Sequence, residues 1–263
     1  MKQCNLRLIA GLIIVFILLV TLYLFYSVNN VPKETFKTIR PTIFVVTVTN
    51  QPEDKRLELL KQSLLNAGFT SEEIKILSTG STFSWAKRMD EWKKFYDSCD
   101  PEDIILSLDA FDVFVLENTR EEIVQKFKDS GHKVLFGSTT YCWPLFCSTC
   151  IFKESNKNFL CAGTYIGYAG VLSKIMGENK WDKDVDDQCY FSTIYRDQPD
   201  RGIGLDTNSN LFQSTTTSAN LNSDKKRVTN VDTNTQPCIL HYDSTHPTYE
   251  KLVDHTKNVL KLW

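Results

Sequence analysis

Short apolar runs alternate with amphipathic stretches along most of the chain. The β-branched and apolar run at residues 42–49 predicts a first strand. Residues 53–67 place Leu57, Leu60 and Leu64 at helical spacing, and a glycine ends that pattern. The same reasoning predicts further strands at 74–77, 104–108 and 133–137, and helices at 84–96 and 120–128. This alternation predicts an α/β fold with a mostly parallel sheet flanked by helices.

The pattern is less regular in the second half of the chain. Residues 141–152 are rich in cysteine and are predicted to form a loop. A short strand is expected at 165–169, a helix at 188–195 and a last strand at 238–241. The polar segment 214–233 predicts either a loop or a hairpin.

The N-terminal region contains one long apolar run. Residues 8–28 carry no charged side chain, and a helix of that length can cross a hydrocarbon core of roughly 30 Å. A cleaved signal peptide has a shorter apolar region, of about 7–15 residues, before a small-residue cleavage site. We therefore expect a short flank at 1–7, a transmembrane signal-anchor at 8–28, a linker at 29–41 and one domain at 42–263.

Basic residues lie on both sides of this span, so the positive-inside rule does not decide its orientation. A short flank before a large domain favours a type II single-pass membrane protein, with the domain in the lumen of the ER or Golgi. The net charge of −2 gives no basic surface for nucleic acid, and no nucleic-acid partner is expected.

Eight cysteines are present, and one of them, Cys4, precedes the apolar run. The odd number that remains cannot all pair within one chain. Cys142, Cys147 and Cys150 are close in sequence, as in a disulfide cluster or half of a zinc site. A second closely spaced pair of ligands, which a zinc site would need, is lacking.

Two carboxylates follow a strand that is predicted to be buried. Asp109 comes directly after the apolar run at 104–108, and Asp112 follows three positions later. Residues i and i+3 of a tight turn approach within about 7 Å, so both side chains could bind one divalent cation. Open α/β sheets bind ligands at the carboxyl ends of their strands. The pattern indicates a transferase with a metal-bound diphosphate leaving group; the alternative is that both aspartates cap a turn or helix.

Other polar residues are candidates for the same site. His241 closes the last predicted strand and either completes the metal site or is structural. Asp186 and Asp187 precede a predicted helix, where they either face a sugar and act as a base or favour the helix dipole. Gly163 and Gly167 permit either a close approach to a ligand or a tight turn.

Taken together, these segments resemble the N-terminal glycosyltransferase domain of the multifunctional procollagen lysyl hydroxylases. The resemblance covers roughly residues 42–255, and its motifs occur in the same order. The matching segments are 46–49, 109–112, 130–136, 142–144, 159–169, 186–188, 205–206, 211–213 and 239–241. Each motif alone is short, whereas the ordered set is specific.

The resemblance implies a GT-A-like, Rossmann-like fold with a mixed, mostly parallel sheet. It also implies Mn²⁺ bound by Asp109, Asp112 and His241, and a UDP-sugar as donor. Carboxylates suit Mn²⁺ or Mg²⁺, and an added imidazole shifts the preference toward Mn²⁺. The resemblance also implies Thr47, Val48 and Thr49 at the uridine, and Lys87 and Asp109 near the diphosphate. Trp143 would pack near the sugar or acceptor, Gly163 would lie close to the donor, and Asp186 and Asp187 would be the catalytic residues.

The expected function is membrane-anchored, Mn²⁺-dependent transfer of glucose or galactose from UDP-glucose or UDP-galactose. The acceptor would be a hydroxyl on a protein or glycan, of hydroxylysine or collagen-like type or another. The family's Asn-Ser-Gly-Gly stretch is Cys161-Ala-Gly-Thr164 in this chain, which removes two polar side chains. That change favours the alternative of a catalytically inactive binding module. His246 is an alternative ligand, because the residues after His241 differ from the family's glycine-containing turn.

Overall fold

The computed structural model describes residues 16–23, 25–26, 41–144, 147, 158–181, 185–214, 219–224, 226–242 and 249–259. The chain divides into two units, Met1–Arg40 and Pro41–Trp263. In the first unit, residues 16–23 and 25–26 are helical, and the rest of the predicted anchor at 8–28 lies outside the described residues. Within the part that is described, no helix is both long enough and apolar enough to span a membrane.

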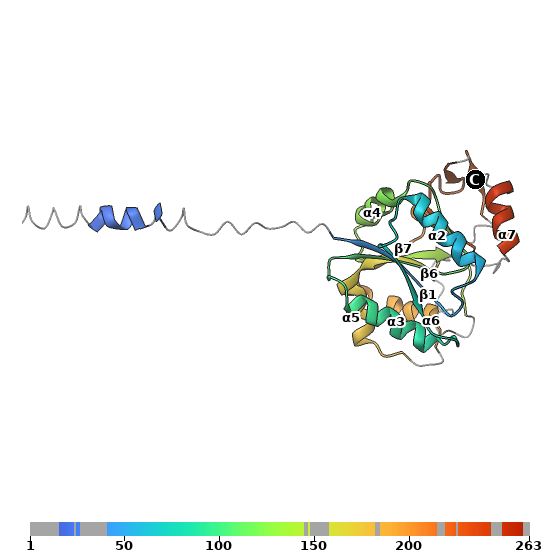
Figure 1. Ribbon diagram of the computed structural model, residues 1–263, viewed down its shortest axis with the longest axis horizontal. Helices are drawn as coiled ribbons and strands as arrows, with labels where there is room; N and C mark the ends of the chain where they lie inside the picture. The colour runs from blue at the N-terminus through green and yellow to red at the C-terminus, as the bar shows by residue number, and fades with distance from the viewer. Residues whose placement is uncertain are drawn as a thin grey trace, which may run out of the picture. The chain divides into compact units, whose positions relative to one another are not determined.

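A six-stranded sheet forms the centre of the second unit (Figure 1), in the order β2-β1-β3-β6-β5-β7. Its strands are β1 (Ile43–Thr49), β2 (Ile74–Ser78), β3 (Ile104–Leu108), β5 (Val134–Thr139), β6 (Phe159–Tyr168) and β7 (Ile203–Asp206). β6 runs antiparallel to its neighbours β3 and β5, and the other pairs are parallel. The predicted mixed, mostly parallel sheet is therefore confirmed.

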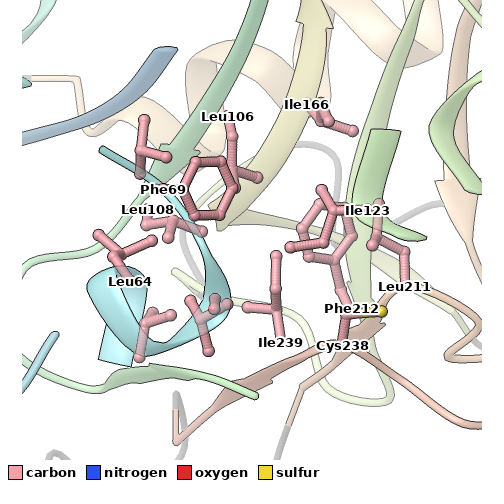
Figure 2. Close-up of a cluster of buried hydrophobic side chains, with 14 of the residues drawn as sticks. Leu64, Phe69, Leu106, Leu108, Ile123, Ile166, Leu211, Phe212, Cys238 and Ile239 are labelled. Carbon is pink, nitrogen blue, oxygen red and sulfur yellow. The ribbon is translucent and has the colours of Figure 1, made fainter. Parts of the chain in front are cut away.

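Helices cover both faces of this sheet (Figure 1). One face carries α2 (Lys55–Ala67) and α4 (Arg120–Asp129), and the other carries α3 (Trp85–Asp97), α5 (Ala169–Glu178) and α6 (Asp187–Asp197). Leu64 and Ile123 from the first pair of helices pack on Leu106 and Ile166 of the sheet (Figure 2). Burial of each such side chain contributes about 1.5–3 kcal/mol.

The boundaries of α2 follow from local chemistry. The carboxylate of Asp54 accepts the backbone N–H of Arg56 and caps the first turn. Gly68 ends the helix with a φ of 103°, a left-handed conformation that glycine adopts without steric cost. The predicted stop at this glycine is confirmed.

A small second sheet lies beside the first. It pairs β4 (Val113–Val115), β11 (Ile239–His241) and β8 (Phe212–Gln213) in the order β4-β11-β8. Leu252 of α7 (Tyr249–Asp254) packs against it, and a π-helical turn, η3 (His255–Val259), follows. The hairpin of β9 (Leu221–Ser223) and β10 (Val228–Asn230) confirms the hairpin option for the polar segment, and η2 (Pro199–Arg201) precedes β7.

The prediction for residues 165–169 was wrong in extent. β6 runs for ten residues, Phe159–Tyr168, and α5 starts at Ala169 without an intervening loop. α5 was not predicted, because four of its ten residues are buried and two glycines weaken its helical signal. A buried strand that leads directly into such a helix gives no change of period in the sequence.

The cysteine-rich segment forms disulfides where it is described. Cys147 is bonded to Cys189 of α6, and Cys142 is also in a disulfide. Cys150 lies outside the described residues. Within the part of the chain that the structure describes, no cysteine belongs to a cluster of possible metal ligands.

Candidate functional site

Three predicted metal ligands meet where the two sheets join. Asp109 follows β3 directly, Asp112 precedes β4, and His241 is the last residue of β11. The backbone N–H of Asp109 donates to the carbonyl of Gly163 at 2.8 Å, which continues the pairing of β3 with β6. The antiparallel pairing of β11 with β4 places His241 opposite the residue that follows Asp112. We call Asp109, Asp112 and His241 the metal corner.

The side chains of the metal corner converge on one point. His241 Nε2 lies 3.7 Å from Asp109 Oδ2 and 3.5 Å from Asp112 Oδ1. One ligand atom from each residue lies within 4.8 Å of the others, and no other such group occurs among the described residues. Two carboxylates and an imidazole suit Mn²⁺ or Mg²⁺, so these residues fit a divalent cation.

Negative charge also shapes the protonation of the metal corner. His241 is buried, which by itself would lower its pKa. Cys161 and Asp112 outweigh this effect, and the pKa of His241 is raised well above its ordinary value. The same local charge would attract a divalent cation.

Gly163 leaves the space that the metal corner needs. A Cβ atom at this position would lie 2.5 Å from Asp109 Oδ2 and 2.9 Å from His241 Nε2, and in still closer contact with His241 Cε1. Any side chain would therefore displace two of the three ligands. This close approach, rather than a tight turn, is the reason for glycine at this predicted site residue.

An ion pair lies beside the metal corner and forms another wall of the site. Arg88 of α3 donates to Asp109 Oδ1, and its Nε lies 3.3 Å from Asp187 Oδ2. Its guanidinium also stacks over Trp92, with 4.5 Å to the ring centroid. Burial would lower the pKa of Arg88, but Asp187 and Asp109 outweigh it, so the pKa is raised and the side chain stays charged. We call Arg88 and Asp187 the ionic wall.

The two predicted catalytic aspartates have different surroundings. Asp186 caps α6, because its carboxylate accepts the N–H of Cys189 at 2.7 Å. Asp187 is the first residue of the helix, and its side chain is buried beside Arg88. Burial raises the pKa of Asp187, Arg88 opposes the rise, and Asp109 and Asp186 add to it. Asp187 is thus the better placed of the two to accept a proton.

Two adjoining cavities meet at these residues. The central cavity, of about 460 Å³, is lined by the metal corner, the ionic wall, Trp143 and Gly163. The second cavity, of about 360 Å³, shares Arg88, Asp109 and Asp112 with it and extends to Val48 and Thr49 at the end of β1. A ligand with two parts can therefore span both cavities past the metal corner.

Most of the predicted site residues, but not all, line these cavities. Thr47 is 3% exposed and lines neither cavity. Lys87 points elsewhere, since its Nζ donates to Thr82 Oγ1 at 3.1 Å. Its neighbour Arg88 faces the site instead. Trp143 is 58% exposed, at the rim of the central cavity.

Sequence reasoning assigned no role in the site to three of its residues. Arg88 gave no signal, because its partners Asp109 and Asp187 are distant in sequence. Gln188 links two walls: its Nε2 donates to the Trp143 carbonyl at 2.8 Å, and its Oε1 accepts the Ala162 N–H at 3.1 Å. Cys161 was noted only as a departure from a motif, yet it contacts His241. His246 lies outside the described residues.

Comparison with known proteins identifies the family. The protein-family model described as PLOD GT domain matches residues 43–260 of this chain. The chain belongs to the PLOD GT domain family. The membership predicted from the ordered motifs is confirmed, and the unit is a glycosyltransferase-type domain.

Curated relatives of this PLOD GT domain are much longer proteins. Procollagen-lysine,2-oxoglutarate 5-dioxygenase of Drosophila melanogaster is 37% identical over 155 residues, which cover 54% of this chain and 21% of that protein. The human multifunctional procollagen lysine hydroxylase and glycosyltransferase LH3 is 30% identical over 172 residues, which cover 62% of this chain and 23% of that protein. The chain thus spans less than a quarter of the length of either relative.

Among solved structures, a glycosyltransferase involved in the glycosylation of the major capsid of PBCV-1 is similar to this PLOD GT domain. The similarity covers 82% of this chain and 99% of that chain, at 14% identity and a TM-score of 0.49.

Proposed function

We propose that this domain transfers glucose or galactose from a UDP-sugar to a hydroxyl acceptor, with Mn²⁺ as the preferred cation and Mg²⁺ as an alternative. The convergence of Asp109, Asp112 and His241 on one point, in a cavity that Asp187 also lines, carries this proposal. The human relative LH3 is named a multifunctional procollagen lysine hydroxylase and glycosyltransferase. A hydroxylysine-type or collagen-like acceptor is accordingly the first to test.

The metal corner would hold the cation and the diphosphate of the donor. A divalent cation at this position neutralises charge on a departing diphosphate, which is worth several kcal/mol. Arg88 is not the natural partner of the phosphates, because its guanidinium already contacts Asp109 and Asp187. Arg88 instead orients the carboxylates of Asp109 and Asp187 by its contacts with both.

The second cavity supports a nucleoside site. It lies at the carboxyl ends of β1 and β3, where open α/β sheets bind nucleotides. Phe111 and Arg56 line it, with the guanidinium of Arg56 4.6 Å from the ring centroid of Phe111, and both kinds of group can stack on a base. Thr49 and Val48 complete the wall toward β1. The uridine contacts therefore involve Val48 and Thr49 rather than Thr47.

The central cavity supports placement of the sugar between the metal corner and Asp187. Burial raises the pKa of Asp187, and a carboxylate of raised pKa accepts protons more readily near neutral pH. Asp187 would accept a hydrogen bond from a sugar hydroxyl or the proton of the acceptor hydroxyl. Trp143, exposed at the rim, would pack against the sugar or acceptor.

We further infer that residues 8–28 anchor the protein, in a type II orientation, with the domain in the lumen of the ER or Golgi. The uncharged apolar run supports the anchor. The disulfide between Cys147 and Cys189 supports an oxidising compartment. Release of the full-length protein from membranes by an alkaline wash without detergent would contradict the anchor.

A catalytically inactive binding module is the second candidate. Cys161 lines the donor cavity, and Cys161 and Ala162 replace two polar residues of the family's motif, which favours this candidate. The binding module would bind a partner or the nucleotide, whereas only the first candidate requires turnover.

Thermal melts and donor profiling of the full-length protein separate the candidates. A ligand that binds only the native state at a hundredfold excess over its Kd stabilises it by about 2.7 kcal/mol. We expect Mn²⁺ with UDP to raise the melting temperature more than either alone, and UDP-glucose or UDP-galactose to be consumed. A shift without turnover would favour the binding module. An unchanged melting temperature would contradict both the transferase and a nucleotide-binding module.

A further inference from the structure

His241 has different partners on the two edges of its ring. On one edge, Nε2 faces the carboxylates of Asp109 and Asp112. On the other edge, Nδ1 lies 3.4 Å from the Sγ of Cys161, a buried residue near the start of β6. The thiol of Cys161 therefore contacts the ring of His241 and does not face the point on which Asp109, Asp112 and His241 converge.

The chemistry of a histidine ligand requires a partner at this second edge. An imidazole that binds a metal through Nε2 must carry its proton on Nδ1, and the group that accepts this proton sets the tautomer and the ring orientation. Cys161 Sγ lies 3.4 Å from Nδ1, within reach of this proton. Sulfur is a weak acceptor, but it is sufficient to select one tautomer when the site is buried.

We propose that Cys161 is a positioning residue that holds His241 in the tautomer and orientation required to bind the divalent cation through Nε2. This inference rests on the proposed function, because it assumes that the metal corner binds a cation. Within it, Cys161 accepts the Nδ1–H of His241 and does not ligate the ion itself. The replacement of the family's asparagine by cysteine then preserves a hydrogen-bond acceptor at this position.

Two residues of β6 would act on the two edges of the His241 ring. Cys161 contacts the Nδ1 edge, while Gly163, two residues later, leaves room for the Nε2 edge. Gln188 holds the residue between them, because its Oε1 accepts the N–H of Ala162. The strand thus supports the ligand from one side and keeps the opposite side open.

A pair of variants isolates the acceptor atom. Cys161→Ala removes it, and Cys161→Ser keeps an acceptor in a side chain of similar size. Cys238→Ala is the matched control, because Cys238 is also a buried cysteine outside disulfides, but it packs in the core beneath α2 and α4. The measurement is Mn²⁺ affinity at saturating UDP, from the electron paramagnetic resonance signal of free Mn²⁺, together with the melting temperature of each variant.

Loss of a second partner of a metal-bound histidine typically weakens metal affinity about 10–100-fold. We expect a loss of about tenfold for Cys161→Ala, near the lower end because sulfur is a weak acceptor. Cys161→Ser and Cys238→Ala should both stay close to the wild type in Mn²⁺ affinity. Equal affinity of Cys161→Ala and the wild type would overturn the positioning role alone. Failure of the wild type to bind Mn²⁺ with UDP would overturn the proposed function as well.

Discussion

The metal corner and the ionic wall line the same cavity, yet they are held in place by different means. Strand ends position the metal corner, and backbone hydrogen bonds between β3 and β6 and between β4 and β11 set its geometry. The ionic wall consists of side chains on two helices, which are held by the attraction between Arg88 and Asp187. Asp109 of the metal corner contacts the ionic wall, with one oxygen toward Arg88 and the other toward His241.

Because the two groups are held differently, they should contribute differently to ligand binding and to the stability of the fold. In the metal corner, the carboxylates of Asp109 and Asp112 converge on His241 Nε2, where a divalent cation would take the place of a ring proton. The ionic wall contains its own cation, so its charge is balanced within the fold. Changes to the metal corner should therefore weaken ligand binding at little cost to folding, and changes to Arg88 should destabilise the fold.

Removal of Arg88 should have the largest effect on stability. Loss of one partner of a buried ion pair costs about 3–5 kcal/mol, because the remaining charge stays buried and unpaired. We expect Arg88→Met to lower the free energy of unfolding by about 3 kcal/mol at neutral pH, as measured by chemical denaturation. Asp187→Leu on this background should restore part of the loss. A loss confined to Mn²⁺ affinity would contradict this role.

The deficit of Arg88→Met should also depend on pH. Arg88 opposes the rise in the pKa of Asp187, so the pKa rises further in the variant. A carboxyl group with a raised folded pKa weakens the fold as pH exceeds its unfolded pKa of about 3.9, and the cost is complete above the folded pKa. Lowering the pH from about 7.5 to about 5 should therefore narrow the gap between variant and wild type. A gap that widens on acidification would contradict the assignment.

Loss of a carboxylate from the metal corner should affect binding and not folding. Asp112→Asn keeps the shape of the side chain but removes a charged ligand, and we expect Mn²⁺-dependent UDP affinity to fall by roughly 100-fold or more. Isothermal titration with UDP at fixed Mn²⁺ measures this loss. Glu102→Gln, an exposed acid at the opposite end of β3, is the matched control and should bind as the wild type does. Retained affinity in Asp112→Asn would remove this residue from the ligand set.

A single methyl group should test the geometry of the metal corner. In Gly163→Ala, the new Cβ would contact both His241 and Asp109, and such overpacking costs about 1–3 kcal/mol. We expect Mn²⁺ and UDP to bind at least about tenfold more weakly, by the same titration. Gly177→Ala in α5 is the control, because its Cβ would meet only Lys93 at 3.4 Å and should stabilise the helix slightly. Equal Mn²⁺ affinity in the two variants would show that Gly163 is not needed for the site.

The metal corner was predictable from sequence, and the ionic wall largely was not. Asp109 and Asp112 follow an apolar run and were noted from the residues, whereas His241, at the end of a short strand, was assigned to the site through the family resemblance. Arg88 lies within an amphipathic helix, where a charged residue is expected on the exposed face. Its burial follows from tertiary contacts with Asp187 and Trp92, which no local pattern encodes.

The same reasoning explains the errors in the fold. Apart from β4, which was not predicted, the helices and strands between residues 42 and 139 were predicted closely, because each has a clear period and a turn at its ends. β6 and α5 form one apolar stretch, and the boundary between them depends on the pairing of β6 with β3 and β5. The bond between Cys147 and Cys189 joins residues 42 apart, and spacing alone could not distinguish it from other pairings.

The smallest expected effect distinguishes the two adjacent aspartates. Asp186 caps α6, and replacement of a capping residue by alanine costs about 1 kcal/mol. We expect Asp186→Ala to lower stability by about this amount, whereas Asp186→Ser, which can still cap, should keep most of it. Both variants should retain Mn²⁺-dependent UDP affinity.

Asp187→Asn provides the contrast, because this residue does not cap the helix through its side chain. We expect it to spare UDP affinity while it lowers transfer or UDP-sugar hydrolysis, since its contacts with the sugar matter most in the transition state. Turnover, UDP affinity and melting temperature measured for all three variants complete the comparison. If Asp187→Asn kept full turnover while Asp186→Ser lost it, the catalytic role would belong to Asp186, and the ionic wall would serve the fold alone.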